Sequence, residues 1–141
     1  MKLKDIIKKS TLQTKIINPL NFFVKGISIH SDQVRNNFIF AAMKGRAHHG
    51  LDFIKDLLDY KNIAVVLSKR DKIPKDFRKS NSVAFIQVDD VRLFISKACS
   101  IFFRNSIKQK IAITGTNGKT SISFYVNQIW RKKNIDGASI G

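Results

Sequence analysis

The sequence predicts an α/β protein in two parts: a small α/β domain over residues 1–88 and the start of a second over 108–141, joined by a helix and linker over 89–107. Two observations support this fold class. Short apolar runs rich in β-branched residues alternate with segments of helical period, which is the pattern of strands joined by helices. In addition, 141 residues that are 43% hydrophobic, with 11 Phe, suffice to bury a core.

Four apolar runs predict the strands of the first domain. The first run alternates between apolar and polar positions, and the second is continuously apolar, as buried strands are. The four runs cover residues 22–30, 38–42, 62–67 and 83–88. Asn18-Pro19 marks a turn before the first of them.

Two segments of this domain and the segment that follows it predict helices. Residues 2–9 form a short polar helix, which we expect to be peripheral. Residues 51–60 carry an apolar helical face, whose inward side chains are expected to be Phe53, Ile54, Leu57 and Leu58. Asp89 and Asp90 follow the last strand and are typical N-terminal cap residues for a helix that runs to about Phe103.

The second domain opens on a glycine-rich stretch that carries chemistry. Residues 111–121 read Ile-Ala-Ile-Thr-Gly-Thr-Asn-Gly-Lys-Thr-Ser, which predicts a strand, a tight turn and the start of a helix. The glycines let backbone N–H groups approach an anion closely, and the helix N-terminus favours the same anion. Lys119 suits the β- and γ-phosphates of a nucleotide, and the hydroxyl of Thr120 suits its Mg²⁺. We therefore predict a nucleotide phosphate site made of Gly115, Thr116, Asn117, Gly118, Lys119, Thr120 and Ser121.

This motif is the short form Gly-x-x-Gly-Lys-Thr, because Ile113 stands where the longer nucleotide-loop pattern has its first glycine. The context supports it, since five apolar residues after the loop fall on one helical face: Ile122, Tyr125, Val126, Ile129 and Trp130. The helix is expected to end near Lys133, before a last strand over 135–140. An ordinary glycine-rich turn is the alternative to a phosphate site.

The net charge of +16 suggests a polyanionic partner when it is taken alone. However, the 19 Lys and 7 Arg are scattered along the chain rather than gathered in one tract. A genome rich in A/T codons explains the abundance of Lys, Ile, Asn and Phe equally well. We therefore expect no dedicated nucleic-acid partner, and a basic nucleic-acid-binding module is kept as an alternative function.

Other compositional features predict a cytoplasmic protein without membrane insertion. No apolar run approaches the length that spans a bilayer, and the N-terminal residues lack the apolar segment of a secretory signal. The single Cys99 agrees with a reducing compartment. It lies on the apolar face of the helix before the linker, so we expect it to be a small buried core residue.

Two further constellations favour structural roles. The run Ile-Gln-Val-Asp-Asp at 86–90 resembles a strand that ends in a metal-binding Asp, but it is better explained as the capped start of a helix. His48 and His49 are adjacent and His30 is distant, so no pair has the spacing of a metal site. The loop histidines are better candidates for contacting a ligand.

Taken with the domain order, the loop resembles that of the Mur ligases, the ATP-dependent amide ligases of peptidoglycan synthesis. Residues 114–120, Thr-Gly-Thr-Asn-Gly-Lys-Thr, match the family's nucleotide signature in its short form. The upstream family pattern is Asp-Ser-Arg, Val, Gly-Asp-Leu-Phe-Val-Ala, Gly and Asp-Gly, and six residues fall at its spacing: Ser31, Val34, Phe40, Ala42, Gly45 and Gly50. Residues 88–92 and 137–141 resemble the MurE type, which adds the third peptide residue. The resemblance covers essentially the whole chain.

The sequence departs from this pattern at the residues flanking Ser31, where His30 and Asp32 replace Asp and Arg, and at Asn37-Phe38, which replaces Gly-Asp. The resemblance implies a first domain that binds the UDP end of UDP-N-acetylmuramoyl-dipeptide through Ile29, Ser31, Arg46, Ala47 and His48. A guanidinium also suits a diphosphate on chemical grounds.

For the second domain, the resemblance implies a P-loop ATP-binding central domain with ATP and Mg²⁺ as cofactors. Residues 115–121 would hold the ATP phosphates, with Lys119 as a catalytic residue and Thr120 on the metal. The substrate's D-glutamyl carboxylate would take the phosphoryl group, and the amine of the incoming amino acid would attack the acyl phosphate. Positioning and charge neutralisation dominate the first step. The full-length enzyme is expected to be a monomer.

The family's other metal ligands, adenine pocket and amino-acid-binding domain would lie beyond Gly141, so we expect the isolated chain to be truncated and inactive as a ligase. The added residue, diaminopimelate or lysine, stays open. A folylpolyglutamate synthase relative has a similar loop and is a further alternative. Residues 31–50 argue against it, because such a relative lacks this leading domain.

Overall fold

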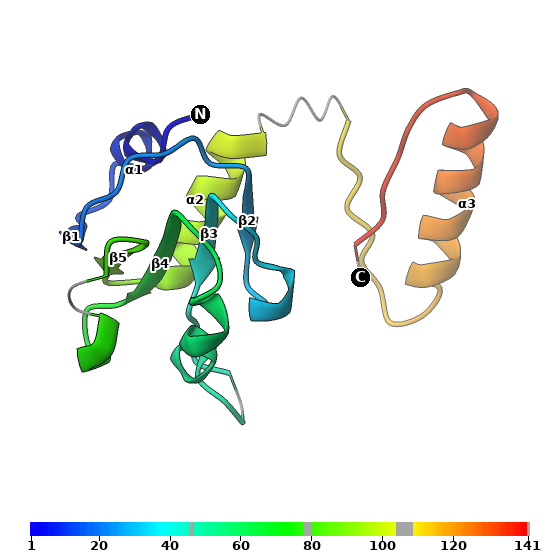
Figure 1. Cartoon of the computed structure of the whole chain (residues 1–141). Helices are drawn as coiled ribbons and strands as arrows, with labels where there is room; N and C mark the ends of the chain where they lie inside the picture. Colours follow the sequence, from blue (N-terminus) through cyan, green and yellow to red (C-terminus); the bar gives the residue numbers. More distant parts are fainter. Residues whose placement is uncertain (46, 78–79, 104–108, 141) are drawn as a thin grey trace. The chain divides into compact units, whose positions relative to one another are not determined.

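The computed structural model describes residues 1–45, 47–77, 80–103 and 109–140. The chain divides into two compact units, Met1–Asn105 and Ser106–Gly141, which are described separately. The first unit contains a five-stranded sheet with helices, so the predicted α/β class is confirmed (Figure 1). None of the helices in the described ranges combines the length and apolarity that a bilayer-spanning helix requires.

The sheet has the strand order β1-β5-β4-β3-β2. Strands β2 to β5 are mutually parallel, whereas β1 pairs antiparallel with β5 at one edge. The strands are β1 (Lys15–Ile17), β2 (Gly26–Ser28), β3 (Phe38–Ala41), β4 (Ile63–Ser68) and β5 (Val83–Val88). The four parallel strands lie within the four predicted runs or within one residue of them, whereas β1 was not predicted.

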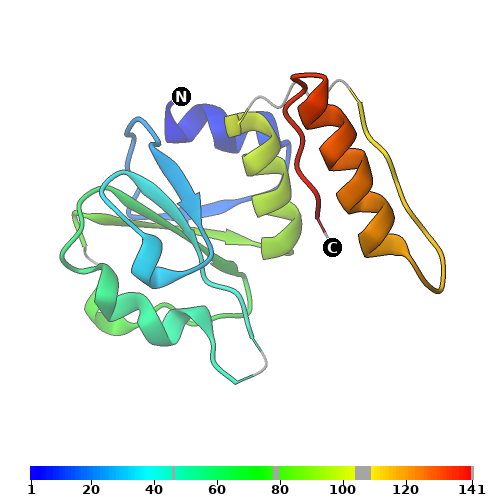
Figure 2. The ribbon, with the colours of Figure 1, turned by 90° about the vertical axis from the view of Figure 1, so that its right-hand side faces the viewer.

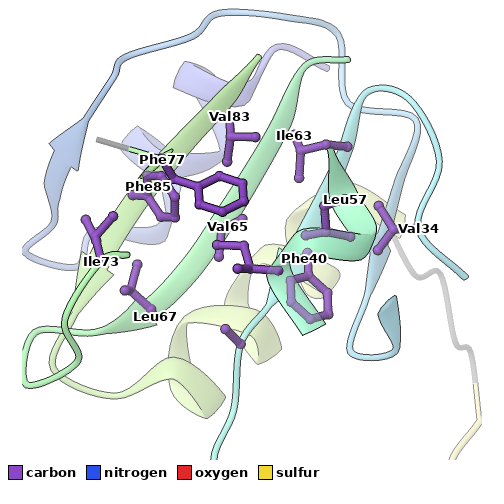
Figure 3. Close-up of a cluster of buried hydrophobic side chains, with 12 residues drawn as sticks. Val34, Phe40, Leu57, Ile63, Val65, Leu67, Ile73, Phe77, Val83 and Phe85 are labelled. Atoms are coloured by element: carbon purple, nitrogen blue, oxygen red, sulfur yellow. The ribbon is translucent and has the colours of Figure 1, made fainter. Parts of the chain in front are cut away.

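Both faces of the sheet are covered, because alternate residues of each strand point to opposite sides. On β4, Ile63 and Val65 face one core cluster, and Ala64 and Val66 face the other. Figure 3 shows the first cluster, which lies against the 3₁₀ helices η2 (Gly50–Leu57) and η3 (Lys75–Phe77). The second cluster lies against α1 (Leu3–Ser10) and α2 (Val91–Phe103), which Figure 2 shows next to each other.

The N-terminal helix is part of the core, so the expectation that it is peripheral was wrong. Leu3 and Ile6 of α1 are fully buried, and the helix packs against α2. The ammonium group of Lys97 on α2 donates a 3.0 Å hydrogen bond to the carbonyl of Ser10, which ends α1. Two apolar positions one turn apart thus place α1 in the core, although half of its residues are charged.

The segment after the second parallel strand is a 3₁₀ helix, and this changes which residues point inward. With three residues per turn, positions three apart share a face, so Ile54 and Leu57 are buried in line with the half-buried Leu51. Phe53 and Leu58 were expected to point inward on an α-helical period, but they are 40% and 61% exposed.

The helix α2 begins as predicted at an aspartate cap. The carboxylate of Asp90 accepts a 3.0 Å hydrogen bond from the backbone N–H of Leu93, and the helix starts at Val91. Cys99 is half-buried rather than part of the buried core. Partial burial raises the pKa of its thiol, because desolvation disfavours the thiolate.

Over the described residues 109–140, the second unit contains one helix, α3 (Lys119–Lys132), and none of the side chains on α3 is buried. The predicted strands before the phosphate loop and over residues 135–140 do not form in the described range 109–140. A strand needs a neighbour for its backbone hydrogen bonds, and the first unit's sheet contains no strand from this region. The predicted apolar face is present on α3, but Ile122, Tyr125 and Ile129 are about half exposed or more.

Candidate functional site

The predicted substrate contacts of the first unit follow the carboxyl ends of β2 and β3. These ends form one edge of the sheet, which is called the sheet edge from here on. These two strands are parallel neighbours, with Ser28 paired to Phe40. The segments that leave them therefore begin next to each other, with Ile29 and Ser31 after β2 and Ala47 and His48 after β3. Ligands of parallel α/β sheets bind at this end of the strands. Arg46, the remaining predicted contact, lies outside the described residues.

A buried serine shapes the turn after β2. The hydroxyl of Ser28 donates a 2.8 Å hydrogen bond to the carbonyl of His30 and accepts one of 3.0 Å from the N–H of the same residue. Ile29 is left 49% exposed, and Ser31 begins the 3₁₀ helix η1 (Ser31–Gln33). The fully buried Val34 anchors the end of η1 in the core. The turn therefore presents an apolar side chain and a hydroxyl on a fixed backbone.

The loop after β3 is closed by backbone hydrogen bonds. The N–H of Gly45 bonds to the carbonyl of His48 at 2.8 Å, and the N–H of Gly50 bonds to the carbonyl of Met43 at 2.9 Å. Ala47 and His48 are exposed, and the His48 ring lies edge-on to Phe53, with ring centroids 5.8 Å apart. The loop is therefore compact and presents an imidazole to solvent.

The second unit carries the glycine-rich loop on the N-terminus of α3. Gly115 and Gly118 have φ angles of 147° and 78°, in the region that only glycine adopts easily. Gly118 is the residue before the helix, and a Cβ there would meet nothing within 4 Å. All seven predicted phosphate-site residues, from Gly115 to Ser121, are exposed. The loop thus has the conformation its glycines require and is open to a ligand.

The side chain of Lys119 folds back over this loop. Its ammonium nitrogen donates hydrogen bonds to the carbonyls of Gly115 at 2.6 Å and Thr116 at 3.2 Å. The first backbone bond within α3 runs from Ile122 to Gly118, so the preceding N–H groups of this first turn have no helical acceptor. The unit thus presents N–H donors, a hydroxyl on Thr120 and one ammonium group around a single loop.

Three curated relatives match most or all of the chain. An enzyme of Rickettsia rickettsii named UDP-N-acetylmuramoyl-L-alanyl-D-glutamate–2,6-diaminopimelate ligase is 39% identical over 118 residues, which cover 84% of this chain and 23% of the relative. Proteins of the same name from Mesorhizobium japonicum and Geobacter metallireducens are 32% and 30% identical and match 100% of the chain, which covers 28% and 27% of them. The chain belongs to the Mur ligase family.

No family model matches the chain. The Mur ligase assignment therefore rests on these relatives, all of MurE type by their names, and the chain spans about a quarter of their length. Because the match to two of them runs through the whole chain, it includes both the sheet edge and the glycine-rich loop.

At the sheet edge of this Mur ligase chain, Asp52 and Asp71 were not singled out from the sequence, and His49 was considered only as a loop residue that contacts a ligand. His49 and Asp52 form a reciprocal cap at the start of η2: the ring Nδ1 of His49 accepts from the N–H of Leu51 at 3.1 Å, and the carboxylate of Asp52 accepts from the N–H of His49 at 2.8 Å. The spacing of a capping box gives a sequence signal, although His is an unusual first member. Asp71, which lies 3.4 Å from His49, carries no local signal.

Other surface features lie apart from these residues. A cavity of about 790 Å³ is lined by Met1, Asp5, Lys8, Lys9 and Phe102, none of which was predicted to bind substrate. Within the described ranges, no three His, Cys, Asp or Glu side chains gather as a protein-bound metal site would require.

Proposed function

We propose that this chain supplies two binding sites of an ATP-dependent ligase that acts on UDP-N-acetylmuramoyl-L-alanyl-D-glutamate. The observation that carries the proposal is the match of the entire chain, through both units, to relatives named for ligating that compound to 2,6-diaminopimelate. Accordingly, we propose diaminopimelate as the added residue and the cytoplasm as the location, where nucleotide-linked precursors and ATP are available.

In this proposal, the edge formed by β2 and β3 binds the UDP end of the substrate. Ile29 gives an apolar contact, Ser31 a hydroxyl, and the loop after β3 contributes Ala47 and His48, with Arg46 as the cation for the diphosphate. The fixed turn at Ser28 and the closed loop support this role, since a binding surface built in advance loses less entropy when ligand binds.

The loop from Gly115 to Ser121 binds the ATP phosphates in this proposal. The exposed N–H groups at the start of α3 suit phosphate oxygens, and Lys119 exchanges its two loop carbonyls for the β- and γ-phosphates. The donor set also fits Mg²⁺, which would take the hydroxyl of Thr120 together with phosphate oxygens. When bound, the ion supplies charge neutralisation during phosphoryl transfer.

The proposed reaction has two balanced steps. An oxygen of the D-glutamyl carboxylate attacks the γ-phosphorus of ATP, the bond to the β-phosphate oxygen breaks, and ADP leaves. The amine of the amino acid then attacks the acyl carbon, phosphate leaves with the C–O electron pair, and a proton is lost from nitrogen. Lys119 contributes by holding phosphate oxygens, while the first unit holds the nucleotide end of the acceptor.

Calorimetry tests each binding site separately. We expect heat from UDP-N-acetylmuramoyl-L-alanyl-D-glutamate that is reduced by Ser31→Ala and unaffected by Lys119→Ala. For Mg-ATP, we expect binding to be unaffected by Ser31→Ala. Lys119→Ala should lower the affinity for Mg-ATP by about tenfold or more, because the charged contact to phosphate is removed. Absence of both heats in a chain shown to be folded would contradict the proposal.

The salt dependence of binding separates this proposal from the alternative of a basic nucleic-acid-binding module, which the net charge of +16 favours. Such a module would bind single- or double-stranded oligonucleotides with an affinity that falls steeply and linearly in log–log form with salt. We expect no such binding at about 0.15 M salt, where the weak attraction of scattered lysines is screened.

A further inference from the structure

Two segments that leave neighbouring parallel strands meet through one pair of side chains. His49 ends the loop after β3, and Asp71 lies in the turn after β4. The ring Nε2 of His49 lies 3.4 Å from the Oδ1 of Asp71, and the two side chains are 25% and 22% exposed. This contact joins the substrate loop of the proposed function to a second segment at the same edge of the sheet.

The hydrogen bonds around His49 determine where its ring carries a proton. Nδ1 accepts a 3.1 Å hydrogen bond from the N–H of Leu51, so this nitrogen bears no hydrogen. A neutral imidazole has its single N–H on the other nitrogen, so the ring nitrogen that lies 3.4 Å from the Oδ1 of Asp71 is the one that carries the hydrogen. One ring thus caps η2 and contacts a carboxylate from another segment at the same time.

Asp71 is itself held on the sheet. Its Oδ2 accepts a 3.1 Å hydrogen bond from the N–H of Ser68, the last residue of β4. Its own N–H bonds to the carbonyl of Ser68 at 3.0 Å, and its carbonyl accepts a longer bond of 3.4 Å from the side chain of Gln87 on β5. The carboxylate facing His49 is therefore fixed to two central strands.

We propose that His49 and Asp71 form a positioning pair that holds the loop after β3 in the shape that binds the UDP-linked substrate. The inference deepens the proposed function and rests on it for the identity of the ligand. The loop's own hydrogen bonds close it at Gly45 and Gly50, but these bonds lie within the loop and its base. The contact of His49 with Asp71, in contrast, joins the loop through side chains to the turn after β4.

Two substitutions separate the parts of this pair. His49→Asn keeps a side-chain oxygen able to cap η2, but its shorter side chain does not reach Asp71. Asp71→Asn removes the negative charge next to Nε2 of His49 and leaves one side-chain oxygen, which can still accept the hydrogen bond from the N–H of Ser68. Asp56→Asn, on an exposed position of η2, makes the same chemical change away from the pair and serves as the control.

The affinity of the full 141-residue chain for UDP-N-acetylmuramoyl-L-alanyl-D-glutamate tests the proposal. Because the pair is partly exposed, we expect each variant to weaken binding roughly two- to fivefold. The double variant is expected to bind no more weakly than the weaker single variant, since both changes break one contact. The melting temperature of Asp71→Asn should match that of Asp56→Asn, because neither substitution changes the core.

A second readout decides the inference if the proposed function fails. Amide hydrogen exchange of residues 44, 45 and 47–49 in the ligand-free chain should be faster in both variants, and the ring ¹⁵N shifts of His49 in the unaltered chain should show an unprotonated Nδ1. If the unaltered chain binds no UDP-linked substrate, the proposed function fails, and unchanged loop exchange would then overturn the positioning pair as well. If the chain binds substrate but both variants bind equally well, only the positioning pair is overturned.

Discussion

The two units of this chain contain the same kinds of local sequence pattern but reach different degrees of order. In the first unit, β-branched runs pair into a sheet whose central residues, such as Val65 and Phe85, are completely buried. In the second, the run before the phosphate loop forms no strand in the described residues, and the apolar face of α3 stays exposed. A helix satisfies its own backbone bonds, whereas a strand requires a neighbour, and among the described residues strands find neighbours in the first unit's sheet.

The largest expected difference between the units concerns aromatic side chains. Phe85 is fully buried, whereas Phe124 on α3 is 58% exposed. We expect Phe85→Ala to lower the free energy of unfolding by about 3–5 kcal/mol, through lost burial and a cavity. Phe124→Ala should change it by less than about 0.5 kcal/mol. Urea unfolding followed by circular dichroism measures both, and similar losses would show that α3 contributes to a common core.

The glycines of the two loops proposed to bind ligand are expected to be needed for different reasons. A Cβ at Gly50 would lie 2.6 Å from the Cα of Ala42, so Gly50→Ala must move backbone and should cost about 1–3 kcal/mol. Gly118 has open space around it and a φ of 78°, so Gly118→Ala suffers only conformational strain.

The consequences of these two substitutions should fall on different measurements. Gly50→Ala should lower the midpoint of urea unfolding and weaken binding of the UDP-linked substrate. Gly118→Ala should leave that midpoint unchanged and instead weaken Mg-ATP binding, because the loop conformation before α3 is altered. An unfolding midpoint shifted equally by both would contradict the distinction.

Two neighbouring aspartates of the first unit allow a helix cap to be compared with an exposed ion pair. Asp90 caps α2, so Asp90→Ala should cost about 1 kcal/mol of unfolding free energy. Asp89 forms an exposed pair with Lys69 at 2.8 Å, and Asp89→Ala should cost well under about 1 kcal/mol. Thermal unfolding at two salt concentrations checks this, since only the small effect of Asp89→Ala should shrink further in high salt.

The smallest expected effect concerns Cys99, whose thiol has a raised pKa because of partial burial. At pH 8 less of it is thiolate than in an exposed thiol, so alkylation by iodoacetamide should be slower in the folded chain than in urea. The raised pKa favours the folded state below the ordinary thiol pKa, and this small contribution is lost as pH rises through the folded value. Equal alkylation rates with and without urea would contradict it.

Local sequence predicted the elements that depend on local physics. Alternating or continuous apolar runs identified the four parallel strands, the aspartate before Val91 identified the start of α2, and the glycine-rich motif identified the loop before α3. The segments after β2 and β3 were proposed as substrate contacts from the family resemblance, and the parallel pairing of the strands brings their described residues to one edge. The parallel pairing of β2 with β3 determines that the two segments lie next to each other, but the pairing itself was not predicted.

Tertiary structure decided what depends on distant partners. It made α1 a core element, converted residues 50–57 to a 3₁₀ helix with a different buried face, added β1 next to β5, and set Asp71 against His49. Sequence alone determined where hydrogen bonds could be satisfied within one segment, at caps, tight turns and helices. Strand pairing, burial and the contact of side chains 22 residues apart depend on surfaces that exist only after the chain has folded, because their energies come from partners remote in sequence.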